Sequence, residues 1–201
     1  MIKLIPKQYK RPLLSAIAKG EFNSIKSIVE QNKIDLNAYD DHSYSPILMH
    51  VLTSFGIKDE SKRLKILRYF LENGADPNLN CKLGYNSLHI AIQQERLIKS
   101  LDLFLSFGGD VNSTDKDGAT VAYWAIQSFP WKSEGEERQI HLNVIEKIFM
   151  LGANLDYANE FGMTPRKWLE HTSEDVQQLA ENCEKLKPIY KPVNTNQPSF
   201  Q

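Results

Sequence analysis

The stretch Gly84-Tyr85-Asn86-Ser87-Leu88-His89-Ile90-Ala91, with the later Gly108-Gly109-Asp110-Val111-Asn112, decides the fold of this chain. Leu88, Ala91 and Ile92 are spaced three and four residues apart and share one face of a helix. A second apolar stripe follows at positions 97, 101, 104 and 105, and a glycine then ends that helix in the left-handed conformation. The stretch predicts a turn-helix-turn-helix unit that cannot bury its apolar faces without neighbouring copies of itself.

Copies of this unit run along the chain. The four-residue signal that opens the first helix stands at Arg11-Pro12-Leu13-Leu14, Ser45-Pro46-Ile47-Leu48, Asn86-Ser87-Leu88-His89, Thr120-Val121-Ala122-Tyr123 and Thr164-Pro165-Arg166-Lys167. The closing signal stands at Asp35-Leu36-Asn37, Gly74-Ala75-Asp76-Pro77-Asn78, Gly108-Gly109-Asp110-Val111-Asn112 and Gly152-Ala153-Asn154-Leu155-Asp156. The joint recurrence resembles the ankyrin-repeat family, whose repeats carry Thr-Pro-Leu-His and Gly-Ala-Asp-x-Asn at these places. The resemblance implies an all-α ankyrin-repeat solenoid of helix-turn-helix units with short β-turn fingers.

Five repeats are expected, at about 11–39, 40–79, 80–114, 115–158 and 159–187, in a single domain over 1–187 with a flexible tail over 188–201. The proline slot falls at positions 12, 46, 87, 121 and 165, and Pro12 is expected to begin the first helix. Repeats two and four exceed the family period of about 33 residues. We expect the extra residues in two long insertions between paired helices, near 55–61 and 129–138. One interpretation is that these insertions are tolerated surface padding. The other is that they have a role, either as a partner contact or as a local brace.

Composition limits the classes of function. The chain has 201 residues, 41% of them hydrophobic, which is enough for a continuous core. Its net charge of −1 gives no global preference for nucleic acid or for an anionic membrane, and neither is expected as a partner. No apolar stretch approaches the ~20 residues of a spanning helix, and no secretory signal is evident. Cys81 and Cys183 are expected to be ordinary thiols, and the protein a cytoplasmic monomer.

No motif for catalysis or for a cofactor is present. The chain lacks phosphate-binding glycine loops, a nucleophile elbow and zinc-ligand spacing. His89 occupies the histidine slot of the family, where the resemblance implies a hydrogen bond that steadies the turn. We therefore expect no enzymatic activity, no cofactor and no metal.

The resemblance implies that a protein partner contacts the fingers and the exposed positions of the inner helices. Transferred slot by slot, with the insertion residue Trp131 added, the expected partner-binding residues are Asp41, His42, Tyr44, Lys82, Leu83, Tyr85, Gln93, Gln94, Lys116, Asp117, Gln127, Trp131, Glu160 and Phe161. Aromatic members are typical interface anchors, and the mildly acidic balance of the fingers suits a basic partner surface.

Two functions fit these expectations. The first is an immunity or inhibitor protein that binds and neutralises a cognate toxin, because the divergent repeats without an attached domain look like small bacterial ankyrin-type proteins of that kind. The second is a generic adaptor or effector that docks onto a larger protein. Both are analogies at the level of the fold, which does not fix function.

Overall fold

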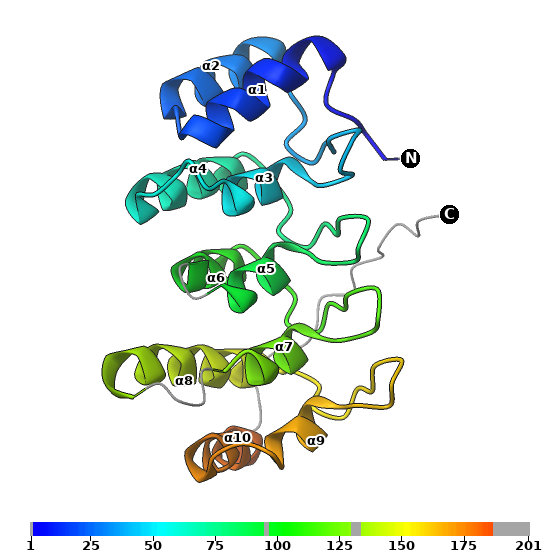
Figure 1. Ribbon diagram of the computed structural model, residues 1–201, viewed down its shortest axis with the longest axis vertical. Coiled ribbons are helices and arrows are strands. Elements are labelled where there is room, and N and C mark those ends of the chain that lie inside the picture. Colours follow the sequence, from blue (N-terminus) through cyan, green and yellow to red (C-terminus); the bar gives the residue numbers. More distant parts are fainter. Residues whose placement is uncertain (1, 95–96, 130–133, 187–201) are drawn as a thin grey trace. The chain divides into compact units, whose positions relative to one another are not determined.

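The computed structural model describes residues 2–94, 97–129 and 134–186, which form ten α-helices and no strand (Figure 1). The all-helical prediction is confirmed. The chain packs as two compact units, an N-terminal unit of residues 2–109 and a C-terminal unit that begins at residue 110. The single array over 1–187 stays a prediction, and the expected tail over 188–201 lies outside the described residues.

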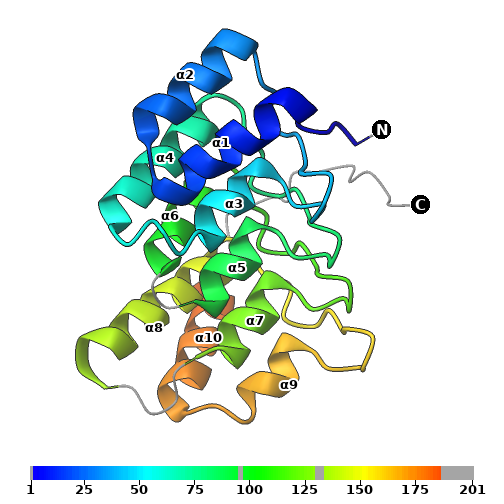
Figure 2. The same cartoon turned by 45° about the horizontal axis from the view of Figure 1, so that its top comes forward.

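The N-terminal unit holds three helix pairs. They are α1 (Lys7–Lys19) with α2 (Phe22–Asn32), α3 (Ile47–Thr53) with α4 (Glu60–Glu72), and α5 (Ser87–Gln93) with α6 (Ile98–Ser106). Contacts join α1 to α3 and α3 to α5 in an inner layer, and α4 to α6 in an outer layer (Figures 1 and 2). Each pair is thus a repeat that buries its apolar faces against the next pair.

The C-terminal unit holds two further pairs. They are α7 (Val121–Gln127) with α8 (Gly135–Met150), and α9 (Pro165–Leu169) with α10 (Glu174–Leu186). The short inner helices α7 and α9 contact each other, and so do the long outer helices α8 and α10. The same two-layer arrangement therefore recurs in this unit.

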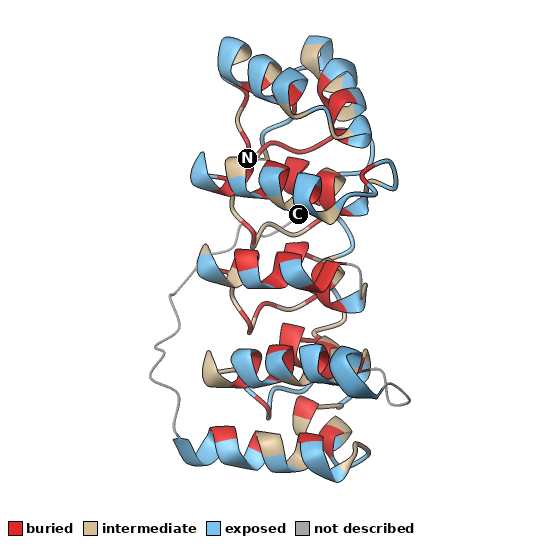
Figure 3. Cartoon of the chain, turned by 90° about the vertical axis from the view of Figure 1, so that its left-hand side faces the viewer, coloured by how far each residue is buried: buried red, intermediate tan, exposed pale blue. Residues whose placement is uncertain are grey.

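The core follows the apolar stripes of the sequence. Leu88, Leu101 and Phe104 are fully buried, whereas Leu105, at the edge of its stripe, is half-buried. Figure 3 shows buried and exposed residues alternating around the helices, as amphipathic helices require. Each fully buried leucine or phenylalanine contributes roughly 1.5–3 kcal/mol. Gly108 has φ +84°, as predicted for the end of α6, and Gly109 donates its N–H to the carbonyl oxygen of Phe104.

Asparagine side chains connect one repeat to the next within each unit. The Nδ2 of Asn37 donates to the carbonyl of Gly74 (2.9 Å), and its Oδ1 accepts from the N–H of Asp76 (2.8 Å). Asn112 makes the same two bonds, to Gly152 (3.1 Å) and from Asn154 (2.7 Å). Asn37 and Asn112 therefore pair with backbone groups of the loop that closes the following repeat.

The predicted start of the first helix was wrong. α1 begins at Lys7, after Pro6, and Pro12 lies inside the helix. Residues 7–10 favour helix, so the helix extends N-terminal of the slot that the repeat pattern marks. Pro12 is exposed, whereas Leu13, Ala16 and Ile17 of the same helix are buried.

The first insertion is shorter than predicted and is anchored by Arg63. Residues 54–59 form the loop, and α4 already starts at Glu60 behind an Asp59 cap that accepts from the N–H of Ser61 (2.8 Å). The guanidinium of Arg63, only 3% exposed, donates to four carbonyl oxygens, which belong to Val51, Leu52, Ser54 and Ile57. Of the two interpretations of this insertion, the packing favours a brace.

The second insertion is partly helical. Residues 130–133 lie outside the described residues, and α8 starts at Gly135, so residues 135–138 form its first turn rather than a loop. Arg138 pairs with Asp175 at the start of α10 (2.8 Å), and its guanidinium lies 4.9 Å from the ring centre of Phe129. The extra residues therefore lengthen the outer helix and tie it to the next one.

Candidate protein-binding surface

In the N-terminal unit, two successive fingers place an aromatic, a cationic and an aliphatic side chain together. Tyr44 is 40% exposed and Leu83 is 56% exposed. The N–H of Lys82 donates to the carbonyl of Tyr44 (3.2 Å), and its Nζ lies 5.9 Å from the centre of the Tyr44 ring. These three predicted residues therefore form one patch, which we call the N-terminal finger patch.

A buried carboxylate fixes the shape of the first finger. Asp40 accepts from the N–H (2.9 Å) and the hydroxyl (2.8 Å) of Ser43, and its own carbonyl accepts from the N–H of Tyr44. Burial alone raises the pKa of Asp40, but the hydrogen bonds from Ser43 outweigh it and hold the pKa well below its usual range. Tyr44 is held at φ +49°, a conformation that is unfavourable for a residue with a side chain. The finger is therefore preorganised.

The other predicted residues of this unit differ in accessibility. Asp41 pairs with Lys10 and is half-buried, whereas His42 is exposed. Tyr85 is half-buried, with its ring edge-on to His89 at 6.1 Å, so it supports the turn more than it presents a free ring. His89 also forms the capping box of α5 with Asn86, which confirms the steadying role that the resemblance implied.

In the C-terminal unit, the fingers that begin at Asp115 and Asn159 are joined by a backbone bond. The N–H of Glu160 donates to the carbonyl of Asp117 (2.9 Å). Beside this bond Phe161 is 76% exposed, and Lys116 pairs with Asp117 at 3.7 Å. The structure thus brings together the four predicted residues of these two fingers.

The predicted inner-helix residues lie at the ends of the short inner helices. Gln93 is the last residue of α5 and Gln94 follows it, while Gln127 is the last residue of α7. Gln93 and Gln127 are exposed, and Gln94 is half-buried. Trp131 lies outside the described residues, so its predicted role stays a prediction.

Sequence reasoning missed three half-exposed aromatic residues on the inner helices of the C-terminal unit. Tyr123 and Trp124 lie on α7, and Trp168 lies on α9. The ring centre of Tyr123 is 6.2 Å from that of Trp124 and 6.1 Å from that of Trp168. We call these three residues the aromatic cluster. The two tryptophans occupy the same slot of successive repeats, and this spacing could have revealed them.

Charge also differs between the two parts of the sequence. Residues 2–109 contain 15 lysines and arginines against 11 aspartates and glutamates, whereas residues 110–201 contain 9 against 14. The near-neutral total therefore hides an excess of basic residues in the first part and of acidic residues in the second.

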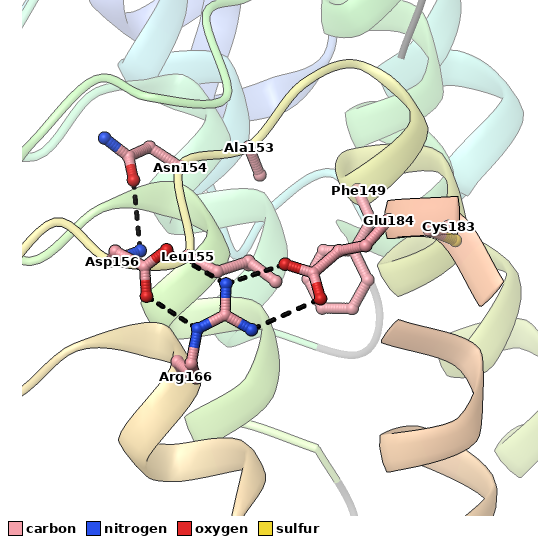
Figure 4. Close-up of a pocket in the computed structure, with 8 residues that line it drawn as sticks. All are labelled: Phe149, Ala153, Asn154, Leu155, Asp156, Arg166, Cys183 and Glu184. Atoms are coloured by element: carbon pink, nitrogen blue, oxygen red, sulfur yellow. Dashed lines mark hydrogen bonds and ion pairs between the residues drawn. The ribbon is translucent and has the colours of Figure 1, made fainter. Parts of the chain in front are cut away.

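A small pocket in the C-terminal unit, of about 290 Å³, is closed on one side by an ion-pair network. Figure 4 shows Arg166 between the carboxylates of Asp156 (2.6 Å) and Glu184 (2.6 Å). Hydrogen bonds to both carboxylates raise the pKa of Arg166. Because the guanidinium is already paired with two acids, it is not available as a free anion site.

Among the described residues, no group of three or more His, Cys, Asp or Glu side chains is placed to hold a metal ion. Nor is any described helix long and apolar enough to cross a membrane.

Comparison with known proteins identifies the family. A model of ankyrin repeats in three copies matches residues 55–159, which is just over half of the chain. The chain belongs to the ankyrin-repeat family. Ankyrin repeats generally act as protein–protein interaction modules, and the exposed fingers described above suit that role.

The similar proteins are longer than this chain. The ankyrin repeat domain-containing protein 63 of Mus musculus is 26% identical over 164 residues, which cover 80% of this chain and 38% of that protein. Its Homo sapiens counterpart is 25% identical over 164 residues, covering 80% and 40%. Palmitoyltransferase AKR1 of Lachancea kluyveri is 23% identical over 210 residues, covering 86% and 27%. This chain thus spans less than half the length of these relatives.

Proposed function

We propose that this ankyrin-repeat chain is a non-enzymatic cytoplasmic protein that binds and neutralises a cognate toxin with a basic surface. The observation that carries the binding role is the N-terminal finger patch, in which Tyr44 and Leu83 stay exposed on fingers whose backbones are fixed. Exposed apolar side chains in a preorganised position lose little entropy when a partner covers them. Such positions are therefore suited to anchor a protein partner.

The toxin-neutralising role rests on the fingers of the C-terminal unit. Exposed acidic residues such as Glu160 lie next to apolar tips such as Phe161. Acidic groups increase the rate of association with a basic protein, and apolar anchors slow dissociation. An inhibitor benefits from both, because it must capture its target quickly and hold it.

A cytoplasmic site is consistent with the cysteines. Cys81 and Cys183 are both free and buried. Burial raises the pKa of the Cys183 thiol, and the nearby Glu146 carboxylate adds to the effect, so the reactive thiolate is disfavoured. Free thiols are typical of a reducing compartment.

A growth assay tests the toxin role. The gene is expressed together with each neighbouring reading frame of its genome, and survival is compared with the neighbour expressed alone. We expect one neighbour to arrest growth and this chain to restore it. A set of neighbours that are all harmless would remove the basis for an immunity role and leave only general protein binding.

The finger patch is tested on the partner found in that assay. Leu83→Ala should weaken binding by about 2 kcal/mol if Leu83 is an anchor. Phe55→Ala is the matched control, since Phe55 is 83% exposed but lies in the first insertion. Binding that survives Leu83→Ala and is lost in Phe55→Ala would place the contact on the insertion instead.

The second candidate function, an adaptor within a larger assembly, is favoured by one observation. The relatives match this chain over only 38%, 40% and 27% of their own lengths, so in them the repeats form part of a larger protein. A stable complex with a non-toxic protein, whose activity is unchanged by binding, would favour this adaptor role.

A further inference from the structure

We infer that the aromatic cluster of the C-terminal unit binds an arginine-rich segment of the partner protein. This inference rests on the proposed protein-binding function and specifies the chemistry of the ligand. It concerns Tyr123, Trp124 and Trp168, which are distinct from the residues predicted from the sequence.

The first argument is the accessibility of the rings. All three members are only partly buried, although they are among the largest side chains on the short inner helices. Tyr123 lies between the two tryptophans, edge to face with each, at interplanar angles of 83° and 79°. A continuous aromatic surface therefore spans α7 and α9, and its partial exposure favours a contact that covers it.

The second argument is the difference between the two tryptophans. The Nε1 of Trp124 donates to the Oδ2 of the buried Asp115 (2.9 Å), so its indole is fixed against the finger. The Nε1 of Trp168 is buried and has no hydrogen-bond acceptor. Trp168 can therefore change its orientation without losing a hydrogen bond, whereas Trp124 cannot.

The third argument is charge. The cluster is attached through Asp115 to the finger that carries Asp117, and Asp117 is bonded through the backbone to Glu160. Lys116 pairs with Asp117 (3.7 Å), whereas Lys167 donates to the neutral carbonyl of Gly162 (2.6 Å) and keeps its charge. The part of the sequence that holds the cluster also has more acidic than basic residues.

These features together select the partner chemistry. A guanidinium stacks on indole and phenol rings while its N–H groups reach carboxylates in a planar, bidentate way. A purely apolar segment would cover the rings but leave the exposed carboxylate of Glu160 without a counter-charge, whereas Asp117 already pairs with Lys116. A nucleic acid would be repelled by the acidic residues. An arginine-rich protein segment can stack its guanidinium groups on the aromatic rings and pair with the acidic side chains.

The test uses the full chain and a nine-residue oligo-arginine peptide, with oligo-lysine and oligo-glutamate of equal length as comparison peptides. Binding is followed by tryptophan fluorescence and by calorimetry. We expect oligo-arginine to bind more tightly than oligo-lysine, and oligo-glutamate not to bind. Trp168→Ala should weaken oligo-arginine binding about tenfold, and Trp168→Phe should weaken it less, because a ring remains.

Two controls separate a specific site from general attraction. Ile90→Ala changes the residue in the same repeat slot of the N-terminal unit and should leave binding unchanged. Asp117→Asn combined with Glu160→Gln should weaken binding and reduce its dependence on salt. Thermal melting of each variant confirms that it is folded.

Equal binding of oligo-arginine by the wild type and by folded Trp168→Ala would overturn the inference, as would tighter binding of single-stranded DNA than of the peptide. If the Trp168→Ala variant also binds the natural protein partner as tightly as the wild type does, the proposed function stands without this site. If the peptide binds as expected but neither a toxin nor any other protein partner is found, the proposed function fails by itself.

Discussion

Replacing Arg63 with methionine should destabilise the protein strongly, although Arg63 is a charged residue on a helix whose other charged side chains face solvent. The guanidinium is almost fully buried and donates to the carbonyl oxygens of Val51 and Leu52 at the end of α3, and of Ser54 and Ile57 in the insertion. Methionine fills most of the volume but donates no hydrogen bond. Four carbonyl groups then lose their donor at a site that water reaches poorly.

The magnitude follows from the cost of unsatisfied groups. Each buried acceptor left unpaired costs about 1–3 kcal/mol, although such values are not additive and partial relaxation lowers the sum. The desolvation of the guanidinium, which Arg63→Met relieves, lowers it further. We therefore expect Arg63→Met to lose on the order of 4 kcal/mol of the free energy of unfolding, which corresponds to roughly 8–16 °C in Tm for a chain of this size.

The assay is urea and thermal unfolding followed by circular dichroism. Arg68→Met is the matched control, because Arg68 is exposed on the same helix and its loss should change stability by no more than about 0.5 kcal/mol. Arg63→Lys should give an intermediate loss, since one ammonium cannot reach four carbonyls in a plane. A loss below about 1 kcal/mol for Arg63→Met, or equal losses for Arg63→Met and Arg68→Met, would refute the brace.

Three further predictions concern single positions. Asn112→Ala removes both bonds between Asn112 and the residues Gly152 and Asn154, and it should cost about 1–2 kcal/mol in urea unfolding; an unchanged midpoint would contradict the bridging role. Gly56→Ala places a methyl group 2.0 Å from the carbonyl oxygen of Ala18 and should cost more than about 2 kcal/mol. Gly74→Ala meets open space at φ +90° and should cost only about 1 kcal/mol, so the reverse order would be inconsistent with the packing of the insertion. The folded protein holds the pKa of Asp40 below its unfolded value of 3.8. The ionised carboxylate therefore contributes fully to the free energy of unfolding above about pH 3.8, and this contribution is lost as the pH falls below it. The free energy of unfolding of Asp40→Asn, measured from about pH 6 to pH 2, should therefore depend less on pH than that of the wild type; parallel curves would contradict this assignment.

Much of the fold could be predicted because it depends on local patterns. The spacing of Leu88, Ala91 and Ile92 and the glycine at position 108 are visible in the sequence, and the structure buries the three apolar residues and gives the glycine a positive φ. The start of α1 was missed because the repeat pattern marks Pro12, while the helix propensity of residues 7–10 extends the helix to Lys7.

The candidate surface was less predictable, because it depends on contacts between distant residues. Leu83 and Phe161 were found from their repeat slots, and both are exposed. Tyr85 was expected to be an accessible anchor, but its ring packs edge-on against the ring of His89. The repeat pattern does not indicate this contact. The brace formed by Arg63 was missed because an arginine on a helix is usually solvated. Trp124 and Trp168 stand three residues after the aligned positions 121 and 165, so their common slot was visible in the sequence, but their shared exposure was not.

The most direct test of the account is site-specific photocrosslinking in living cells. A photoreactive phenylalanine analogue is placed at Leu83 or Phe161 on the fingers, or at the exposed positions Arg68 or Glu146 on the outer helices. If the fingers bind a protein partner, light should produce a discrete adduct of higher mass from the finger positions and none from the outer-helix positions. An adduct from Arg68 or Glu146, with none from Leu83 or Phe161, would contradict the central claim.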